Sequence, residues 1–460
     1  MNVIVSPLVG TVVAVKVRVG DTVDADTELV IIESMKMEHP VHAGESAVIS
    51  EVLVAVGDTV VDQQHLVVMS PSLSPSDQPK SKIVIDDGTK AQREDLIGYQ
   101  LRRQRTTDAA RPDAVSKRHE RGQRTVRENI ADLCDADSFI EYGTFAIAAQ
   151  RQRRHIEELI DRTPADGLVS GLGTVNGALF DHEQSRCAVV GYDYTVLAGT
   201  QGFINHRKKD RLFDIVERLR LPVVIFAEGG GGRPGDTDAP GVAGLDVMSF
   251  ARLSGLAPTI GIASGYCFAG NAALLGCCDV IIATENSNIG MAGPAMIEGG
   301  GLGVVSPTDI GPIDVQSGNG VVDIRVADEV AAVSIAKKYL AFFQGTTTGW
   351  SRYPDESLRP LIPEQRSRIY DVHTVITQLA DIESVLELRA EFGVGIITAL
   401  ARIEGRPVGV IANNPGHLGG AIDADAADKA SRFIQLCDAY DVPIISLCDT
   451  PGFMVGPDAE

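Results

Sequence analysis

The sequence predicts a multidomain protein in which a small all-β domain precedes an α/β domain that is present in two copies, the second of them truncated. Three features support this prediction: a short internal repeat near the N-terminus, a segment rich in Ser and Pro after it, and a long internal repeat over the rest of the chain. The 460 residues, of which 44% are hydrophobic, suffice for two to four domains with sizeable cores.

The composition argues against several classes of protein. Lys and Arg number 41 and Asp and Glu number 62, so the formal net charge is −21, which disfavours a general binder of nucleic acids or anionic membranes. The 7 cysteines include no C-x-x-C pair, which indicates a reducing compartment and no zinc ribbon. The N-terminus lacks the features of a signal peptide, and no run of about 18 apolar residues could span a membrane. We therefore expect a cytoplasmic protein without a membrane segment.

The short repeat predicts a flattened β-barrel. Residues 17–23, VRVGDTV, return 37 positions later as VAVGDTV at residues 54–60, and alternating valines around Gly-Asp are typical of strand-turn-strand units. Two such half-units form a pseudo-twofold whose midpoint lies close to Lys36. We expect Lys36 at the tip of a hairpin in a domain covering residues 1–70. The alternative is an ordinary surface lysine whose neighbours Met35 and Met37 lie in a small core.

A change of composition separates this domain from the rest of the chain. Residues 70–82, SPSLSPSDQPKSK, predict an extended tether, and we place the linker at residues 71–92. A strongly basic, helical stretch follows at residues 102–127. Its cations are Arg102, Arg103, Arg105, Arg111, Lys117, Arg118, Arg121, Arg124 and Arg127. The stretch is either a solvated helical arm or an anchor for a phosphate-bearing substrate.

The long repeat predicts two copies of one α/β domain. LPVVIFAEGGGGRPG at residues 221–235 returns 221 positions later as VPIISLCDTPGFMVG. Upstream, RCAVVG at residues 186–191 matches RPVGVI, and Lys209 matches Lys429, each 220 positions later. Each half contains a strand, a Gly-rich loop, a helix bearing the lysine, a buried strand and another Gly-rich loop. We place the first copy, with its basic arm, at residues 93–345, and a connector with the partial second copy at residues 346–460.

Two Gly-rich segments of the first copy are candidate sites. Residues 230–235 match G-x-G-x-x-G, but no helix opens directly after them, which disfavours a dinucleotide site. The backbone N–H groups of this loop, at Gly231 and Gly232, could still stabilise a developing negative charge. In SGYCFAGNAALLG, residues 264–276, small residues around Gly270 let a ligand approach, and Asn271 begins a buried helix whose N–H groups suit an oxyanion hole. The alternative is a helix start that needs small residues only for packing.

Other catalytic constellations are not expected. Cys267 is predicted to be a buried, inert cysteine rather than a nucleophile. GIASG at residues 261–265 misses the G-x-S-x-G elbow by one place, and the His and Asp residues show no metal-ligand spacing. We therefore expect neither a hydrolytic triad nor a metal site.

The segment ESMKM at residues 33–37 closely resembles the biotinylation motif of biotin carboxyl carrier domains. In that family the lysine between two methionines carries biotin, which implies covalent biotin on Lys36 with Met35 and Met37 beside it. The usual residue before the first methionine is Ala, where this chain has Ser34. The resemblance covers about residues 2–70 and implies a biotin protein ligase as a partner.

Residues from about 115 to 460 resemble the carboxyltransferase of biotin-dependent acyl-CoA carboxylases of the propionyl-CoA and methylcrotonyl-CoA type. The shared stretches include RTVRENI at residues 124–130, the Gly-rich loop, residues 267–272 and TPGF at residues 450–453. The resemblance implies a duplicated crotonase-like fold, with Gly270 and Asn271 as the oxyanion pair for an acyl thioester. Many relatives have Gly-Gly at this pair, so Asn271 adds a side chain. Lys208, Lys209 and Arg211 are candidate contacts for the phosphates of CoA.

The resemblance implies that carboxybiotin on Lys36 releases CO₂ beside the α-carbon of an acyl-CoA, and that backbone N–H groups stabilise the enolate that attacks it. A separate biotin carboxylase subunit or domain would charge the biotin, and a homo-oligomer is expected. One alternative is a biotin-dependent acyl-CoA decarboxylase or transcarboxylase. Because the image of Gly270 in the second copy would fall near residue 491, beyond Glu460, we expect a fragment. The other alternative is therefore a non-catalytic carrier or scaffold.

Overall fold

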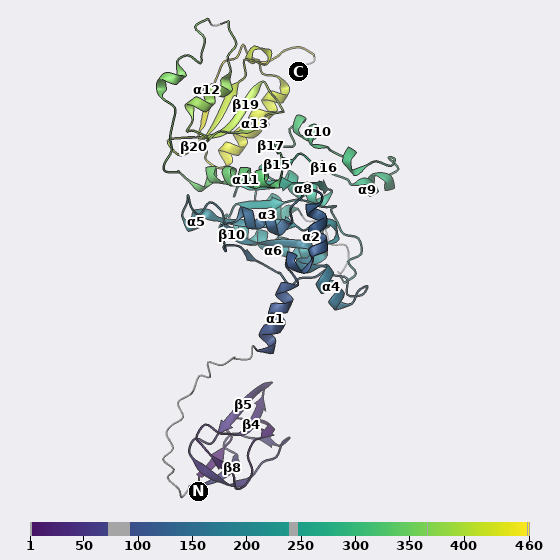
Figure 1. Cartoon of the computed structure of the whole chain (residues 1–460), viewed down its shortest axis with the longest axis vertical. Helices are drawn as coiled ribbons and strands as arrows, with labels where there is room; N and C mark the ends of the chain where they lie inside the picture. Colours follow the sequence, from purple (N-terminus) through teal and green to yellow (C-terminus); the bar gives the residue numbers. More distant parts are fainter. Residues whose placement is uncertain (1, 72–92, 239–246, 366, 458, 460) are drawn as a thin grey trace. The chain divides into compact units, whose positions relative to one another are not determined.

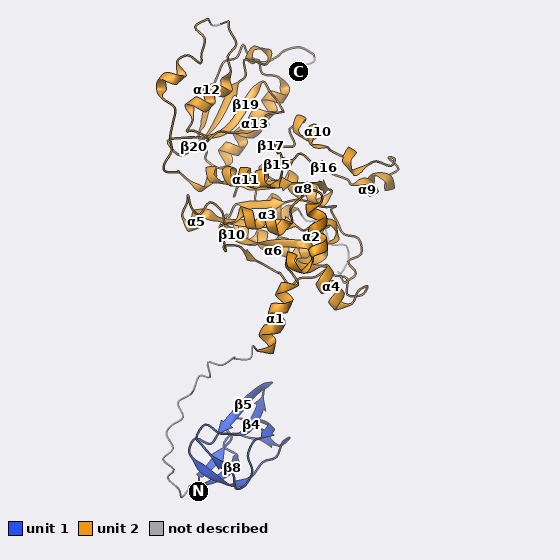
Figure 2. Ribbon diagram, viewed as in Figure 1, with its two compact units in different colours: residues 1–91 blue, residues 92–460 orange. Residues whose placement is uncertain are grey.

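In a computed structural model of the chain, the structure describes residues 2–71, 93–238, 247–365, 367–457 and 459. The chain folds into two compact units, residues 1–91 and 92–460, which Figure 2 draws in blue and orange. Residues 72–92, which hold nearly all of the expected tether and linker, lie outside the described residues.

The first unit is built from short strands in two four-stranded sheets. The strands are β1 (Asn2–Val5), β2 (Gly10–Val15), β3 (Thr22–Val23), β4 (Glu28–Ser34), β5 (Met37–His42), β6 (Ala47–Val52), β7 (Thr59–Val60) and β8 (His65–Pro71). One sheet has the order β1-β8-β6-β3 and the other β5-β4-β2-β7. Each strand of one sheet is thus replaced in the other by its counterpart from the opposite half of the repeat. This pseudo-twofold confirms the two half-units expected from the sequence.

The two Gly-Asp turns of this unit have the same geometry. Gly20 and Gly57 take left-handed φ values of 96° and 99°. The carboxylate of Asp21 accepts from the Arg18 amide at 2.8 Å, and that of Asp58 accepts from the Ala55 amide at 2.8 Å. Since L side chains rarely adopt such φ values, glycine at both positions explains why the repeat is visible in the sequence.

The second unit contains three β-sheets, of seven, four and two strands, with helices packed against them (Figure 1). Its strands are β9 (Ile140–Glu141), β10 (Leu168–Thr174), β11 (Arg186–Tyr192), β12 (Val223–Phe226), β13 (Thr259–Ala263), β14 (Tyr266–Phe268), β15 (Val280–Thr284), β16 (Asn288–Gly290), β17 (Ile324–Val326), β18 (Leu386–Leu388), β19 (Ile396–Ile403), β20 (Arg406–Asn413) and β21 (Ile444–Leu447). Its helices are α1 (Glu94–Gln104), α2 (Pro112–His119), α3 (Val126–Leu133), α4 (Ile156–Arg162), α5 (His182–Ser185), α6 (Phe203–Leu219), α7 (Met248–Ala251), α8 (Gly270–Gly276), α9 (Pro294–Gly299), α10 (Ile313–Gly318), α11 (Glu329–Gln344), α12 (Val372–Leu379) and α13 (Ala424–Ala439).

The larger sheet of this unit has seven strands in the order β17-β15-β13-β12-β11-β10-β9. The strands β11, β12, β13, β15 and β17 are parallel, whereas β10 runs antiparallel to both of its neighbours, β11 and β9. Strands β12, β13 and β15 are buried along their whole length, as apolar runs such as VVIF and VIIAT predict for parallel strands covered on both faces. Their carboxyl ends therefore lead into loops at one edge of the sheet, the usual place for a binding site in such sheets.

Helices cover both faces of the seven-stranded sheet. On one face α6 and α8 pack through Leu212, Phe213, Val216, Leu274 and Leu275. On the other face α3 and α11 pack through Ile130, Leu133, Val333, Ala336 and Leu340. The core formed by α3 and α11 also contains Leu400 of β19 and Phe433 of α13. One hydrophobic core therefore joins the seven-stranded sheet to the four-stranded sheet.

The four-stranded sheet of this unit, which is separate from the two-stranded sheet of β14 and β16, has the order β18-β19-β20-β21. Its first three strands are antiparallel, and β20 pairs with β21 in parallel. The strands β9, β10, β11 and β12 of the larger sheet have the same order and the same directions.

Candidate functional site

Lys36 lies at the tip of a tight hairpin in the first unit. Strands β4 and β5 pair in antiparallel register up to Ser34 and Met37, which leaves Met35 and Lys36 as a two-residue turn. Both turn residues take left-handed φ values, 53° and 67°, as a hairpin turn of this length favours. Such turns normally use Asn or Gly, so Met and Lys in these positions cost on the order of 1 kcal/mol each.

The side chains of this turn are exposed. Met35 is 95% exposed and Met37 is 64% exposed, and Lys36 is exposed between them. The alternative from the sequence, in which the methionines fill a small core, is therefore wrong. Among residues 2–71, no hydrogen bond or ion pair engages the Lys36 ammonium group. An amine presented in this way is free to be modified.

In the second unit, the Gly-rich loop after β12 is held on both sides by backbone hydrogen bonds. Gly229 donates to the Tyr266 carbonyl at 2.7 Å and accepts from the Phe268 amide at 2.9 Å. The Gly231 carbonyl accepts from the amide of Gln201 at 2.7 Å, and the Gln201 carbonyl accepts from that of Arg233 at 2.7 Å. The loop thus joins β14 to the turn that precedes α6.

A buried ion pair anchors the far end of the loop. The Arg233 guanidinium contacts the carboxylate of Asp166, which is 0% exposed, and also donates to the Thr200 carbonyl at 3.0 Å. Asp166 takes a left-handed φ of 52° and accepts from the Asn205 amide at 2.8 Å. The pair has no obvious signal in the sequence, because its members are 67 residues apart.

The loop reaches the start of α8. Gly231 has a φ of 80°, and a Cβ there would lie 2.6 Å from the Ala269 Cβ and 3.0 Å from the Gly270 nitrogen. Ala269 has a left-handed φ of 52°, and its amide donates to the Gly290 carbonyl at 3.0 Å. The predicted residues Gly231 and Gly270 therefore lie side by side, whereas Gly232 forms a bridge with Gln201.

The side chain of Asn271 is buried. From the sequence, where many relatives have Gly, we expected it to project into the substrate pocket. It is 0% exposed, and its Nδ2 donates to the carbonyls of Gly199 and Glu228 at 3.1 Å and 2.9 Å. The amide group therefore points into the protein.

A buried charge cluster that the sequence did not reveal lies behind the loop. Arg118 pairs with Glu228 at 2.6 Å and lies 3.9 Å from Glu329, which accepts from the Ser264 hydroxyl at 2.9 Å. These residues line a small cavity at the carboxyl ends of β11, β12 and β13. Burial raises the pKa of Glu228 to about 7, although the guanidinium of Arg118 opposes this. The only hint in the sequence is an acidic residue between a buried strand and four glycines.

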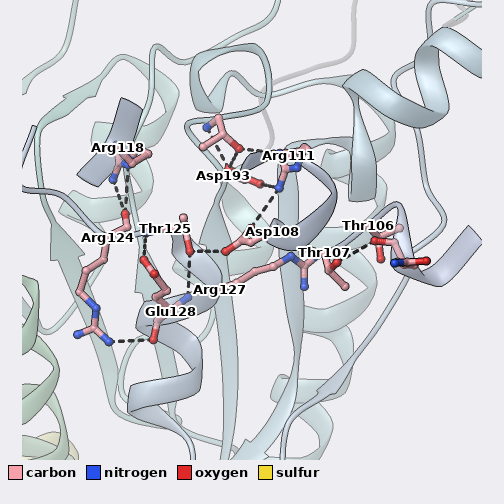
Figure 3. Close-up of polar contacts among 12 residues, drawn as sticks. Thr106, Thr107, Asp108, Arg111, Arg118, Arg124, Thr125, Arg127, Glu128 and Asp193 are labelled. Carbon is pink, nitrogen blue, oxygen red and sulfur yellow. Dashed lines mark hydrogen bonds and ion pairs between the residues drawn. The ribbon is translucent and has the colours of Figure 1, made fainter. Parts of the chain in front are cut away.

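The basic stretch at residues 102–127 is largely ion-paired within the unit, as Figure 3 shows in part. Five of its arginines have internal partners: Arg105 pairs with Glu157 and Asp161, Arg111 with Asp108 and Asp193, Arg118 with Glu228, Arg124 with Asp132, and Arg127 with Glu141. Neither alternative from the sequence predicted this role for these five arginines. Arg105 attaches the end of α1 to α4, Arg127 attaches α3 to β9, and Arg118 contributes directly to the buried cluster.

The three candidate CoA contacts on α6 do not lie together. Lys208 and Arg211 line a cavity of about 480 Å³ with Arg207 and Tyr142. The Lys208 ammonium donates to the carbonyls of Ala165 and Leu168, and burial lowers its pKa to about 8. Lys209 is only 1% exposed and contacts His206 and Asp210 instead.

Three further observations concern the classes of site and protein that the sequence disfavours. Cys267 is fully buried, and burial raises its pKa, in keeping with the prediction of an inert thiol. The part of the chain that the structure describes holds no group of three or more His, Cys, Asp or Glu residues suited to a metal ion. No helix within the described ranges is long and apolar enough to cross a membrane.

Curated relatives match much of the chain. The 12S subunit of methylmalonyl-CoA carboxyltransferase from Propionibacterium freudenreichii subsp. shermanii is 32% identical over 363 residues, which are 75% of this chain and 66% of that protein. The propionyl-CoA carboxylase beta chain of Saccharopolyspora erythraea is 32% identical over 373 residues, which are 75% of this chain and 65% of that protein. The chain therefore spans slightly less than two thirds of these relatives.

Solved structures agree with these relatives. A single-chain, multi-domain long-chain acyl-CoA carboxylase is 53% identical with a TM-score of 0.78, and the match covers 100% of this chain and 44% of that one. The transcarboxylase 12S hexamer is 28% identical with a TM-score of 0.68, and the match covers 81% of this chain and 72% of that one.

The family models divide the chain in the same way as the two compact units. Residues 2–69 match the family described as "Biotin-requiring enzyme". Residues 117–460 match the family described as "Carboxyl transferase domain". The chain therefore belongs to the carboxyl transferase domain family and carries a domain of the biotin-requiring enzymes ahead of it.

Proposed function

We propose that Lys36 carries biotin covalently and that the second unit transfers a carboxyl group between this biotin and the α-carbon of an acyl-CoA. One observation carries the proposal: a single chain combines a carrier lysine on an exposed, strained turn with a contact between a Gly-rich loop and a helix start in a carboxyl transferase domain. The solved relative with 53% identity acts on long-chain acyl-CoA, so we propose long-chain acyl-CoA as the first substrate to test.

The residues around Lys36 fit a covalently attached biotin. The Lys36 side chain is exposed and lies on a two-residue turn whose backbone is fixed by the paired strands β4 and β5. Biotin joined to Nζ by an amide bond would supply a ureido nitrogen that accepts and releases CO₂. Met35 and Met37 flank the amine and would offer apolar surface to the attached group or to a biotin protein ligase.

The catalytic contribution of the second unit is electrostatic. Removing the α-proton of a thioester places negative charge on the carbonyl oxygen, and preorganised N–H donors stabilise that charge by several kcal/mol. We propose the backbone amides of Gly270 and Asn271 as the donors, and Gly231 and Gly232 as the residues that line the opposite side of the site. The held positions of Gly229, Gly231 and Arg233 support this role, since a donor that does not need to reorganise is the effective kind.

We also propose that residues 93–345 and 346–460 hold two copies of one crotonase-like domain. The equal order and directions of β9-β10-β11-β12 and β18-β19-β20-β21 support this duplication. Further support comes from left-handed residues 221 positions apart, Leu197 with Leu418 and Arg220 with Asp441, and from the bridges Gln201–Gly232 and Ile422–Phe453. In this register Lys208, rather than Lys209, corresponds to Lys429, so the pairing by sequence was one position out.

The partners that we propose follow from the same chemistry. A biotin carboxylase subunit or domain would load CO₂, and a biotin protein ligase would attach the cofactor. Lys208 and Arg211 remain our candidates for CoA phosphates, because both line one cavity with Arg207; Lys209 is the weaker candidate because it is buried. A homo-oligomer in the cytoplasm is the expected working form; the related 12S protein is a hexamer.

Two measurements test the function. After co-expression with a biotin protein ligase, trypsin should no longer cleave after Lys36, so residues 19–80 should appear as one peptide that carries the mass of one biotinyl group. Lys36→Arg should abolish this peptide, whereas Lys16→Arg should not. Purified chain should then transfer a labelled carboxyl group from an α-carboxyacyl-CoA to free biotin, with a preference within a series of acyl lengths. Unmodified Lys36 in the presence of the ligase would contradict the carrier role, and an absence of transfer with every acyl-CoA would favour a scaffold.

A further inference from the structure

We infer that Asn271 is a positioning residue, whose side-chain amide fixes the distance between the amides at the start of α8 and the Gly-rich loop. This inference rests on the proposed function, because the amides matter only if they hold an acyl thioester. It concerns the side chain of Asn271 and not its backbone donor.

The contacts of the amide group define the role. Nδ2 carries two hydrogens and donates to two backbone carbonyls, those of Gly199 at 3.1 Å and Glu228 at 2.9 Å. The side chain is 0% exposed, so no solvent competes for these bonds. Among the described residues no other donor reaches either carbonyl oxygen. One side chain therefore satisfies two buried acceptors, from segments 72 and 43 residues away.

The two carbonyls lie where two backbone segments meet without side chains between them. A Cβ at Gly199 would lie 2.4 Å from the Glu228 carbonyl oxygen, and a Cβ at Gly229 would lie 2.3 Å from the Gly199 oxygen. Two oxygens with the same partial charge repel each other at such a crossing unless a donor lies between them. A primary amide is the uncharged side chain that supplies two hydrogens from one nitrogen.

The bridge connects directly to the candidate site. Glu228 is followed by Gly229, Gly230 and Gly231, and a Cβ at Gly231 would come within 3.0 Å of the Gly270 nitrogen. Asn271 is the next residue after Gly270, so its side chain joins α8 to the loop that faces the same amides. If the bridge is lost, the carbonyls separate and the loop shifts relative to α8. Oxyanion donors act at about 2.7–3.1 Å, and a displacement of about 1 Å can lower a rate about 100-fold.

The chain offers a matched control. The Nδ2 of Asn176 also donates to two acceptors, the Lys337 carbonyl at 2.9 Å and the Gln344 side-chain oxygen at 2.8 Å. These contacts attach a turn to α11 rather than to the Gly-rich loop. Asn176 has a left-handed φ of 64°, which Asp tolerates. Asn176→Asp and Asn271→Asp therefore remove the same two hydrogens at different places.

The kinetic test compares the full-length, biotinylated chain with Asn271→Asp, Asn271→Ala, Asn271→Ser and Asn176→Asp. For carboxyl transfer from an α-carboxyacyl-CoA to free biotin, we expect kcat to fall about 100-fold in Asn271→Ala and Asn271→Asp with little change in KM. Asn271→Ser, which keeps one donor, should lie between them and the unchanged chain. Asn176→Asp should keep kcat within about twofold of the unchanged chain, even if its melting temperature falls as much as that of Asn271→Asp. Equal kcat losses in Asn176→Asp and Asn271→Asp, or an unchanged kcat in Asn271→Ala, would overturn the inference.

A second measurement does not depend on activity. Amide hydrogen exchange should become faster in peptides that cover residues 228–232 and 268–272 of Asn271→Ala, and stay unchanged there in Asn176→Asp. Unchanged exchange in Asn271→Ala would overturn the positioning role. An unaltered chain that exchanges as expected but transfers no carboxyl group would count against the proposed function alone.

Discussion

The tip of the β4–β5 hairpin and the Gly-rich loop after β12 are two turns with opposite designs. Both use left-handed backbone, at Met35 and Lys36 in the hairpin and at Gly229 and Gly231 in the loop. The hairpin tip is held only by the ladder beneath it and exposes its side chains. The loop is partly buried, at Gly229 and Gly231, and is held by an ion pair, by backbone bonds and by the Asn271 amide. A carrier group needs reach, whereas a site that stabilises charge needs fixed dipoles, and the two turns meet these needs separately.

The largest expected effect is at the hairpin tip. Lys36→Arg keeps the charge and the turn but removes the amine, so biotin attachment and all transfer that uses the chain's own carrier should be lost completely. The melting temperature should stay within about 1 °C, because the Lys36 side chain is exposed. Streptavidin blotting and calorimetry check both statements, with Lys16→Arg as the unaffected control. Carrier-dependent transfer that survives in Lys36→Arg would refute the assignment.

The next effect concerns the anchor of the loop. Arg233→Ala leaves the buried carboxylate of Asp166 without its cation, and we expect a loss of about 3–5 kcal/mol in the free energy of unfolding. Arg352→Ala, which removes an exposed ion pair with Asp355, should cost at most about 1 kcal/mol. Urea denaturation of both variants measures the difference. Similar losses in the two would show that the loop is no better anchored than an ordinary surface turn.

A pH effect should appear in the loop region and not at the hairpin. Burial raises the pKa of Glu228 from 4.5 to about 7, so the folded state holds this proton more tightly than the unfolded chain. Its contribution to stability is complete below about pH 4.5 and is lost as the pH rises through about 7, by up to about 3 kcal/mol. Glu228→Gln should remove this part of the pH dependence. Unfolding measured between pH 4 and 8 checks the prediction, and parallel profiles for the two proteins would contradict it.

The smallest predicted effect tests the contact between the loop and α8. In Gly231→Ala the new methyl group would meet the Ala269 Cβ at 2.6 Å and force a left-handed alanine, at a cost of about 1–3 kcal/mol. Gly230→Ala is the matched control, because its methyl group would meet only Thr200, at 3.5 Å. We expect kcat for carboxyl transfer to fall about tenfold or more in Gly231→Ala and to change little in Gly230→Ala. If the two variants behave alike, the close approach does not shape the site.

Features that depend on residues close together in the sequence were predictable from the sequence alone. The hairpin that presents Lys36, the two half-units of the first domain and the buried parallel strands depend on periodicity, on glycine in left-handed turns and on a repeat that is visible as letters. The sequence also predicted Gly231 and Gly270 as site residues, and the structure places them side by side; their catalytic role stays a prediction.

The partners of buried polar groups were decided only by the tertiary structure. Arg118 belonged to a basic stretch with two plausible roles, and only the packing of α2 against the sheet brings it to Glu228, 110 residues away. The same holds for Arg233 with Asp166 and for the acceptors of Asn271. Periodicity says which face of an element is buried, but not which distant element covers it. The desolvation of a charge or an amide makes a partner obligatory, and the order of the strands determines which residue that partner is.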